Sequence, residues 1–226
     1  MSTNSQADPA GKPARIAVWD LAIRLWHWLI AALIPAMWYT AEEHMFGLHR
    51  TLGIVLVGLL AFRLVWGVIG SRTARFTALI RAPAAIAGYA IYLLRPGYRP
   101  GVGHNPLGAL SVIALMLALV AQTISGLFAV DTDGLNSGPL SRFVSFGFGR
   151  DAADFHEASF NILLALIALH LAAIAFYLLA KKTNLISPMV TGKARVDGEP
   201  NTSPSVVSWL VAVAIAGAVG AYLLQL

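Results

Sequence analysis

Two histidines, His156 and His170, interrupt an otherwise apolar stretch between Asp154 and Lys182 that is long enough to cross a membrane. Their spacing of fourteen residues corresponds to about 21 Å along a helix and falls about 40° short of four whole turns. Both imidazoles therefore lie on one helical face at two depths. Because polar side chains are costly in a bilayer core and usually have a function there, this spacing predicts two stacked sites, each with a partner from elsewhere in the chain.

The composition is that of an integral membrane protein. Of the 226 residues, 58% are hydrophobic and 12% are charged, and the mean hydropathy is +0.70. A chain this apolar cannot expose its surface to water, and its long uncharged runs indicate membrane spans. Because the chain has no cysteine, disulfides, thiolate-ligated iron–sulfur clusters and cysteine nucleophiles are excluded. Histidine is then the obvious metal-binding side chain.

Five apolar runs are long enough to be spans. They are Leu21–Tyr39, Thr51–Ile69, Leu107–Ala129, the stretch that holds His156 and His170, and Val206–Leu226. Asp20 is expected to cap the first helix, and Pro106 suits the first turn of the third. The basic connector between the second and third runs contains Pro83–Leu94. This segment is too short to span, so we predict an amphipathic helix on the membrane surface.

The net charge of +5 does not indicate nucleic acid, because the basic residues lie between apolar runs. Lys and Arg concentrate in the connector after the second run, in the segment after the fourth and in the N-terminal region, whereas the opposite loops are rich in Asp and Glu. The distribution predicts a multi-pass membrane protein with a cytoplasmic N-terminus. The fifth run carries no charge, and its glycines and alanines make it either an anchor or packing helix or a docking helix for another subunit.

With this topology, the histidines fall at two levels. His27 and His170 belong to the cytoplasmic half, whereas His49 and His156 lie near the opposite surface. A heme iron takes axial ligands on both faces, and the helices of a bundle can supply them, so the two levels fit a two-heme bundle. A histidine in a span can instead be a packing residue or part of a proton path. Zinc fits less well, because its sites are compact clusters of three or four ligands.

Several segments form a recognisable pattern in order between Val18 and Lys193. They are VWDLAIRLWHWLIA, LHRTLG leading to FRLVWGVIGSRTARF, GHNPLG, FHEASFNILLALIALH and NLISPMVTGK. With them, the chain resembles the bacterial cytochrome b561 family, which is related to the cytochrome b subunits of nickel–iron hydrogenases. The resemblance implies an all-α membrane protein, a four-helix transmembrane bundle that binds two b hemes, plus a fifth C-terminal transmembrane helix. It implies bis-histidine iron ligation by His27, His49, His156 and His170.

The expected division of the chain follows from the same pattern. It comprises a cytoplasmic tail (1–17), the di-heme bundle (18–193), a linker (194–205) and the additional transmembrane helix (206–226).

Charged groups and loop histidines complete the expected sites. Arg24, one turn before His27, and Arg50, beside His49, are candidates to bind heme propionates, or else they set topology or snorkel. The loop residues His44 and His104 are interpreted as interfacial or quinone-site residues.

These features predict a di-heme b-type cytochrome that transfers electrons between a quinone pool and a periplasmic c-type cytochrome or dehydrogenase subunit. An electron-transfer subunit is favoured over a stand-alone enzyme. Two alternatives stay open. One is a self-sufficient oxidoreductase that passes electrons from superoxide to quinone, as some members of the family do. The other is a non-redox anchor or transport subunit, although the chain shows no paired broken helices or inverted repeat.

Overall fold

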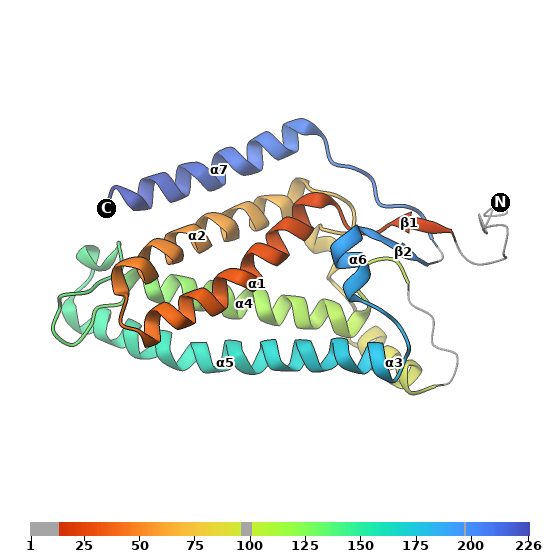
Figure 1. Cartoon of the computed structure of the whole chain (residues 1–226), viewed down its shortest axis with the longest axis horizontal. Helices are drawn as coiled ribbons and strands as arrows, with labels where there is room; N and C mark the ends of the chain where they lie inside the picture. Colours follow the sequence, from red (N-terminus) through yellow and green to blue (C-terminus); the bar gives the residue numbers. More distant parts are fainter. Residues whose placement is uncertain (1–13, 96–100, 197) are drawn as a thin grey trace. The chain divides into compact units, whose positions relative to one another are not determined.

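The computed structural model describes residues 14–95, 101–196 and 198–226 (Figure 1). The elements in chain order are β1 (Arg15–Ala17), α1 (Leu21–Glu42), α2 (Phe46–Ile69), η1 (Phe76–Ala78), α3 (Pro83–Leu94), α4 (Pro106–Phe128), η2 (Ser141–Phe143), α5 (Phe146–Leu179), α6 (Ile186–Thr191), β2 (Lys193–Arg195) and α7 (Val206–Leu224). Residues 1–13 of the predicted cytoplasmic tail (1–17) and Arg99 of the basic connector lie outside the described residues.

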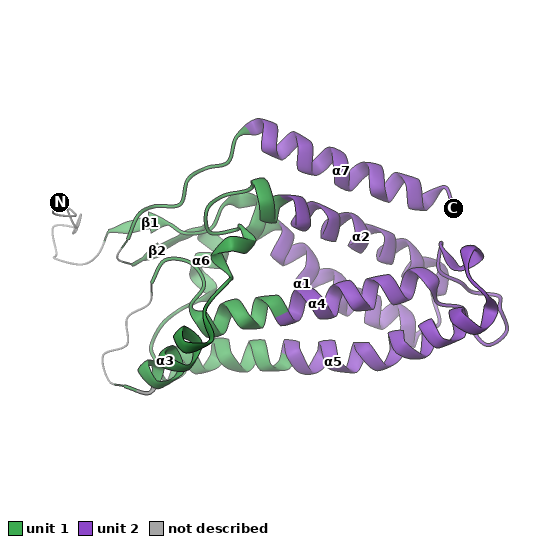
Figure 2. Ribbon diagram, turned by 180° about the vertical axis from the view of Figure 1, so that it is seen from behind, with its two compact units in different colours: residues 1–25, 66–113, 168–205 green, residues 26–65, 114–167, 206–226 purple. Residues whose placement is uncertain are grey.

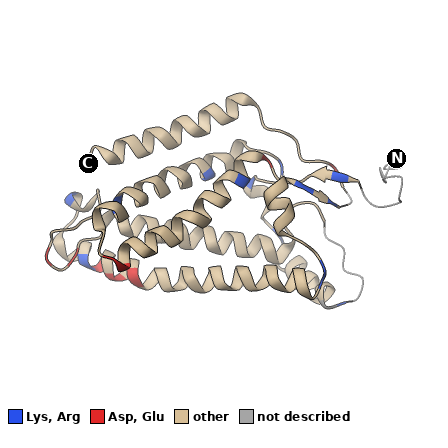
Figure 3. Cartoon of the chain, in the orientation of Figure 1, with Lys and Arg blue, Asp and Glu red and all other residues tan. Residues whose placement is uncertain are grey.

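Five of the described helices, α1, α2, α4, α5 and α7, are long and apolar enough to cross a membrane, and they match the five predicted spans in number and place. Most of the described Lys, Arg, Asp and Glu residues lie in loops and near helix ends (Figure 3). The short helix α3 forms at the predicted residues, and Pro106 begins α4 as expected. The chain is therefore a multi-pass, predominantly helical membrane protein.

Two helices begin earlier than the apolar runs indicate. Helix α2 begins at Phe46, five residues before Thr51, so His49 lies within the helix. Helix α5 begins at Phe146, eight residues before Asp154. Its first turn is stabilised by Ser145, whose Oγ accepts from the backbone N–H of Phe148 over 3.3 Å. These first turns are partly polar, and a hydropathy pattern does not reveal helix outside the apolar core.

The chain forms two compact units, which are coloured separately in Figure 2. Unit 1 comprises Met1–Leu25, Trp66–Ile113 and Ala168–Ser205, and unit 2 comprises Trp26–Val65, Ala114–Ile167 and Val206–Leu226. Helices α1, α2, α4 and α5 contribute residues to both units. His27, His49 and His156 consequently belong to unit 2, and His170 belongs to unit 1.

In unit 1, Asp20 fixes the start of α1. One carboxylate oxygen accepts from the backbone N–H of Ile23 over 2.8 Å, which confirms the predicted cap. The other oxygen accepts from the indole N–H of the buried Trp66 over 3.2 Å and from the Ser71 hydroxyl. The side-chain amide of Asn201 donates to the same Ser71 hydroxyl over 3.0 Å. The cap therefore joins the start of α1 to two distant loops of this unit.

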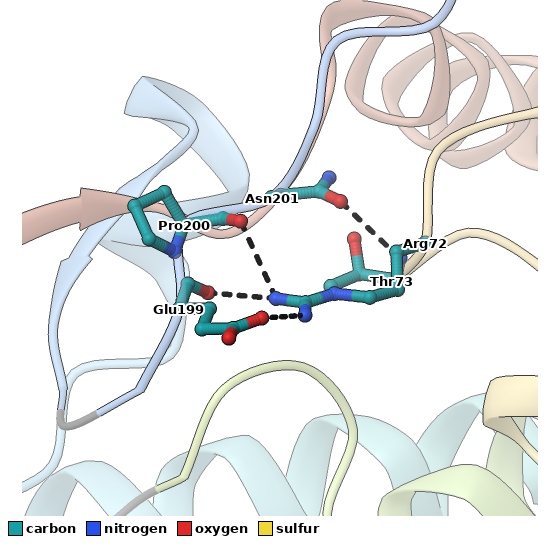
Figure 4. A network of polar contacts seen from close by, with 5 residues as sticks. All are labelled: Arg72, Thr73, Glu199, Pro200 and Asn201. Carbon is teal, nitrogen blue, oxygen red and sulfur yellow. Dashed lines mark hydrogen bonds and ion pairs between the residues drawn. The ribbon is translucent and has the colours of Figure 1, made fainter. Parts of the chain in front are cut away.

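A neighbouring network holds the segment that precedes α7 (Figure 4). Arg72 forms a 2.7 Å ion pair with Glu199 and donates to the backbone oxygens of Glu199 and Pro200. The backbone N–H of Thr73 donates to Asn201 Oδ1 over 3.3 Å. The ion pair is exposed and contributes little by itself. The backbone contacts are what fix the path of the chain.

A two-stranded sheet closes unit 1, and it was not predicted. Strand β1 pairs antiparallel with β2, with Arg15 opposite Arg195. Just before β2, Gly192 adopts the left-handed conformation at φ 79°. Its carbonyl oxygen accepts from the N–H groups of Val18 and Trp19 over 2.8 and 3.1 Å. The polar segment after the fourth span is thus hydrogen-bonded to residues 15–19.

In unit 2, segments of α1, α2, α4, α5 and α7 lie side by side (Figure 2). Helix α7 lies close to α2 at Gly58, where an added Cβ would lie 3.3 Å from the Ala216 oxygen. The glycines of α7 make no such approach, because a Cβ at Gly217 or Gly220 would meet nothing within 4 Å. They instead line an apolar cleft of about 550 Å³ between the two helices.

Candidate functional site

The structure brings two of the predicted site histidines together within unit 2. The ring centroids of His49, on α2, and His156, on α5, are 6.2 Å apart and the ring planes are 86° apart. Two imidazoles that each give one nitrogen to a shared metal ion have centroids about 6 Å apart, because a metal–imidazole bond is about 2 Å long. The spacing therefore fits two histidines that would hold one heme iron between them.

Each of these rings is oriented by a backbone carbonyl on a neighbouring helix. Nδ1 of His49 lies 2.9 Å from the Met37 oxygen on α1, and Nδ1 of His156 lies 2.8 Å from the Gln122 oxygen on α4. A carbonyl oxygen only accepts, so in each neutral ring the proton is on Nδ1 and the lone pair is on Nε2. Metal-binding histidines are commonly held in this way. Both rings therefore have the tautomer that an iron ligand requires.

A buried hydroxyl accompanies each carbonyl. Thr40 donates to the Met37 oxygen over 2.9 Å and lies 3.4 Å from Nδ1 of His49. Ser125 donates to the Gln122 oxygen over 3.0 Å and lies 3.2 Å from Nδ1 of His156. Sequence reasoning missed both hydroxyls. The available signal in each case was a small hydroxyl residue, Thr or Ser, at or near the end of an apolar run.

The histidine pair lines a cavity of about 920 Å³ in unit 2. This volume is in the range of cofactor pockets. Gly126 keeps α4 close to the site, since an added Cβ would lie 2.8 Å from Cε1 of His156. Cavity size, ring spacing and tautomers together fit a heme held between His49 and His156.

Charged residues line the same cavity. Arg50, a predicted propionate partner, is among them, together with His44 and Glu157, and all three are exposed. Asp131 also lines the cavity, and hydrogen bonds from Asn136 hold the pKa of its carboxyl below the usual value. The Arg50 guanidinium is the cation that this group can offer to an anionic ligand.

The remaining predicted residues are divided between the units. His27 in unit 2 packs edge-on against Trp28, with ring centroids 5.1 Å apart. His170, on α5, and Arg24, on α1, both belong to unit 1. The Nε atom of Arg24 is buried and has no hydrogen-bond partner in the described part of the chain. A buried guanidinium N–H of this kind suits an anionic group such as a heme propionate.

Unit 2 contains a further buried cation. Arg63 on α2 is only 2% exposed, and its guanidinium carbon lies 5.8 Å from the ring centre of Trp26, the residue before His27. The indole N–H of Trp26 in turn donates to the Leu59 oxygen over 2.8 Å. These contacts join α1 to α2 next to His27 within unit 2.

These features define a multi-pass membrane protein with a histidine-lined cavity. A model of the prokaryotic cytochrome b561 family matches residues 18–192, and the chain belongs to this family. Family membership implies heme b and electron transfer in the membrane, and it confirms the resemblance noted in the sequence.

The chain is also similar to two curated proteins. They are the probable Ni/Fe-hydrogenase B-type cytochrome subunits of Azotobacter chroococcum mcd 1 and Azotobacter vinelandii. Each is 23% identical over 226 residues, which cover 85% of this chain and 93% of the relative. No solved structure matches the chain.

Proposed function

We propose that the chain is a di-heme b-type cytochrome that carries electrons across the bacterial inner membrane between a quinone pool and a periplasmic redox partner. The observation that carries the proposal is the His49–His156 pair, with a centroid spacing of 6.2 Å and both Nδ1 atoms on backbone carbonyls. When bound, heme supplies a one-electron couple. The chain holds the ring, orients the ligands and excludes water.

The two hemes are assigned to different histidine pairs. His49 and His156 hold one heme, and His27 and His170 hold the other, within a four-helix bundle of α1, α2, α4 and α5. The first assignment is supported by the ring geometry in unit 2. The second is supported by the helical spacing of His156 and His170 along α5.

The propionates of the two hemes are assigned to the two predicted arginines. Arg24 serves the His27–His170 heme, and its buried Nε supports this role. Arg50 serves the His49–His156 heme, since it lines the same cavity. Charge-assisted hydrogen bonds from a guanidinium are well suited to carboxylates.

The N-terminus is cytoplasmic in this proposal, which places His49 and His156 on the periplasmic side. The hydrogenase names of the two relatives support a partner enzyme subunit that exchanges electrons with the chain. Helix α7 lies outside the four-helix bundle and provides additional membrane surface for such a subunit. Quinone is the proposed exchange partner within the membrane.

Spectroscopy of the purified protein tests the proposal. Reduced-minus-oxidised spectra are expected to show b-type absorbance, with two hemes per chain by pyridine hemochrome. His49→Ala and His156→Ala should each remove the same heme, and His27→Ala and His170→Ala the other. Absence of b-type absorbance after adequate heme supply would reject the cytochrome, and loss of different hemes within one pair would reject the pairing.

A further inference from the structure

We infer that Gln122 is a positioning residue for His156 and that its side-chain amide raises the reduction potential of the heme that His156 holds. The inference rests on the proposed ligation by His49 and His156. Gln122 lies in the membrane-spanning helix α4 and is only 8% exposed. A polar side chain buried at this depth is costly unless it is hydrogen-bonded.

Gln122 contacts both nitrogens of the His156 ring. Its backbone oxygen lies 2.8 Å from Nδ1, and its side-chain Nε2 lies 3.1 Å from the ring Nε2. Because Nδ1 carries the proton, the ring Nε2 is an acceptor, and the amide must turn its NH₂ group toward it. One residue on α4 thereby fixes both the tautomer and the orientation of the ring.

Ser159 fixes the other end of the amide. Its hydroxyl donates to Oε1 of Gln122, and Ser159 is itself only 5% exposed. Ser159 lies one turn after His156 on α5, so this bond links the amide to the helix that carries His156. The direction of the amide dipole is therefore set by two contacts, with the NH₂ end toward the iron-binding nitrogen.

The ring Nε2 that contacts the amide is the same atom that binds iron in the proposed site. One lone pair cannot serve both, so the amide N–H would have to give up its contact with Nε2 when heme binds. The Ser159 hydroxyl holds Oε1 of the amide, and an amide held at that end would keep its NH₂ group toward the bound heme. A fixed dipole with its positive end toward the iron favours the reduced state, which carries one more electron.

A purely structural role makes a different prediction. Buried amides in membrane helices often join two helices by hydrogen bonds of modest strength. In that case, a leucine of similar size would preserve packing and leave the heme potentials unchanged. The reduction potential of the heme in Gln122→Leu therefore distinguishes the two roles, whereas the heme content does not.

The experiment compares Gln122→Leu, Ser159→Ala and a control in the purified holoprotein. The control is Thr123→Val, which removes a hydroxyl from the same turn of α4. That hydroxyl donates its hydrogen bond to the Leu119 oxygen of its own helix. The readouts are heme content, redox titration of each heme and the low-spin EPR signals. Gln122→Leu should retain two hemes, lower the potential of one and shift its EPR signal. Ser159→Ala should lower the potential of the same heme by less, and Thr123→Val should change neither heme.

Unchanged potentials in Gln122→Leu, within the scatter of Thr123→Val, would overturn the inference. If Gln122→Leu binds no heme, Ser159→Ala decides, and an unchanged potential there rejects the role of the amide. His156→Ala separates the two proposals. Retention of both hemes in His156→Ala would reject ligation by His156. Loss of one heme in His156→Ala, together with unchanged heme potentials in Gln122→Leu, would reject only the role of Gln122.

Discussion

The Nδ1 proton of His49 is donated to the backbone oxygen of Met37 over 2.9 Å, and the equivalent bond joins His156 to Gln122 over 2.8 Å. In both cases, a hydroxyl three residues after the carbonyl donates to the same oxygen. The same arrangement of a backbone carbonyl and a hydroxyl therefore holds both histidines, between α1 and α2 in one case and between α4 and α5 in the other. A carbonyl that already accepts from a hydroxyl is a weaker acceptor for the ring N–H.

Removal of these hydroxyls should make the ligands more electron-donating. In Thr40→Val and Ser125→Ala, the carbonyl loses its hydroxyl donor and accepts more strongly from the ring N–H, which increases the basicity of the imidazole and lowers the heme potential. A hydrogen-bond change of about 1 kcal/mol corresponds to about 40 mV for a one-electron couple. Redox titration should show a shift of this order in the same heme for both variants, with heme content retained. Shifts in two different hemes would contradict a shared site.

Gly126 should be intolerant of larger side chains. A Cβ there would lie 2.8 Å from Cε1 and 3.1 Å from Nδ1 of His156, so Gly126→Val must push the ring or α4 away. Overpacking of this kind costs about 1–3 kcal/mol. Pyridine hemochrome assay should show one heme in place of two. The matched control is Gly217→Ala, whose Cβ meets nothing within 4 Å and which should retain both hemes.

The turn between α1 and α2 predicts opposite effects for two substitutions of His44. Its φ of 57° is left-handed, which disfavours β-branched residues and suits glycine. His44→Val should lower the free energy of unfolding by about 1–2 kcal/mol, whereas His44→Gly should raise it by about 0.5 kcal/mol. Thermal unfolding followed by heme absorbance measures both. Loss of quinone reduction in a fully folded His44→Gly protein would favour the quinone-site interpretation instead of a backbone role.

The sequence was informative where the signal is local. Apolar length located the five candidate spans, and Asp20 and Pro106 marked helix starts, because caps and first turns depend on adjacent residues. Depth estimates also placed His49 at the level of His156, and the structure brings these rings together in unit 2. Their role as ligands stays a prediction, because it depends on the cofactor.

Other features depend on which helix faces and distant segments meet. The pairing of Arg15 with Arg195 joins segments from opposite ends of the chain, and no local pattern reveals it. Gln122 is one of several polar residues in an apolar run, and only the packing of α4 against α5 shows that it contacts His156. The polar first turns of α5 lack the apolar periodicity by which the rest of that helix was recognised.

The last prediction concerns Gly192, whose backbone positions Arg24 in unit 1. Its φ of 79° is unfavourable for any L side chain, and an added Cβ would overlap Nη1 of Arg24. Gly192→Ala should therefore displace the guanidinium and lower the free energy of unfolding by about 1–2 kcal/mol. If Arg24 binds a propionate, the same variant should also lower the potential of one heme, because a cation near the iron favours the reduced state. Gly101→Ala, with open space at the Cβ position, is the matched control. Thermal unfolding and redox titration together distinguish the outcomes, and a destabilised protein with unchanged potentials would reject the role of Arg24 while leaving the backbone role of Gly192 intact.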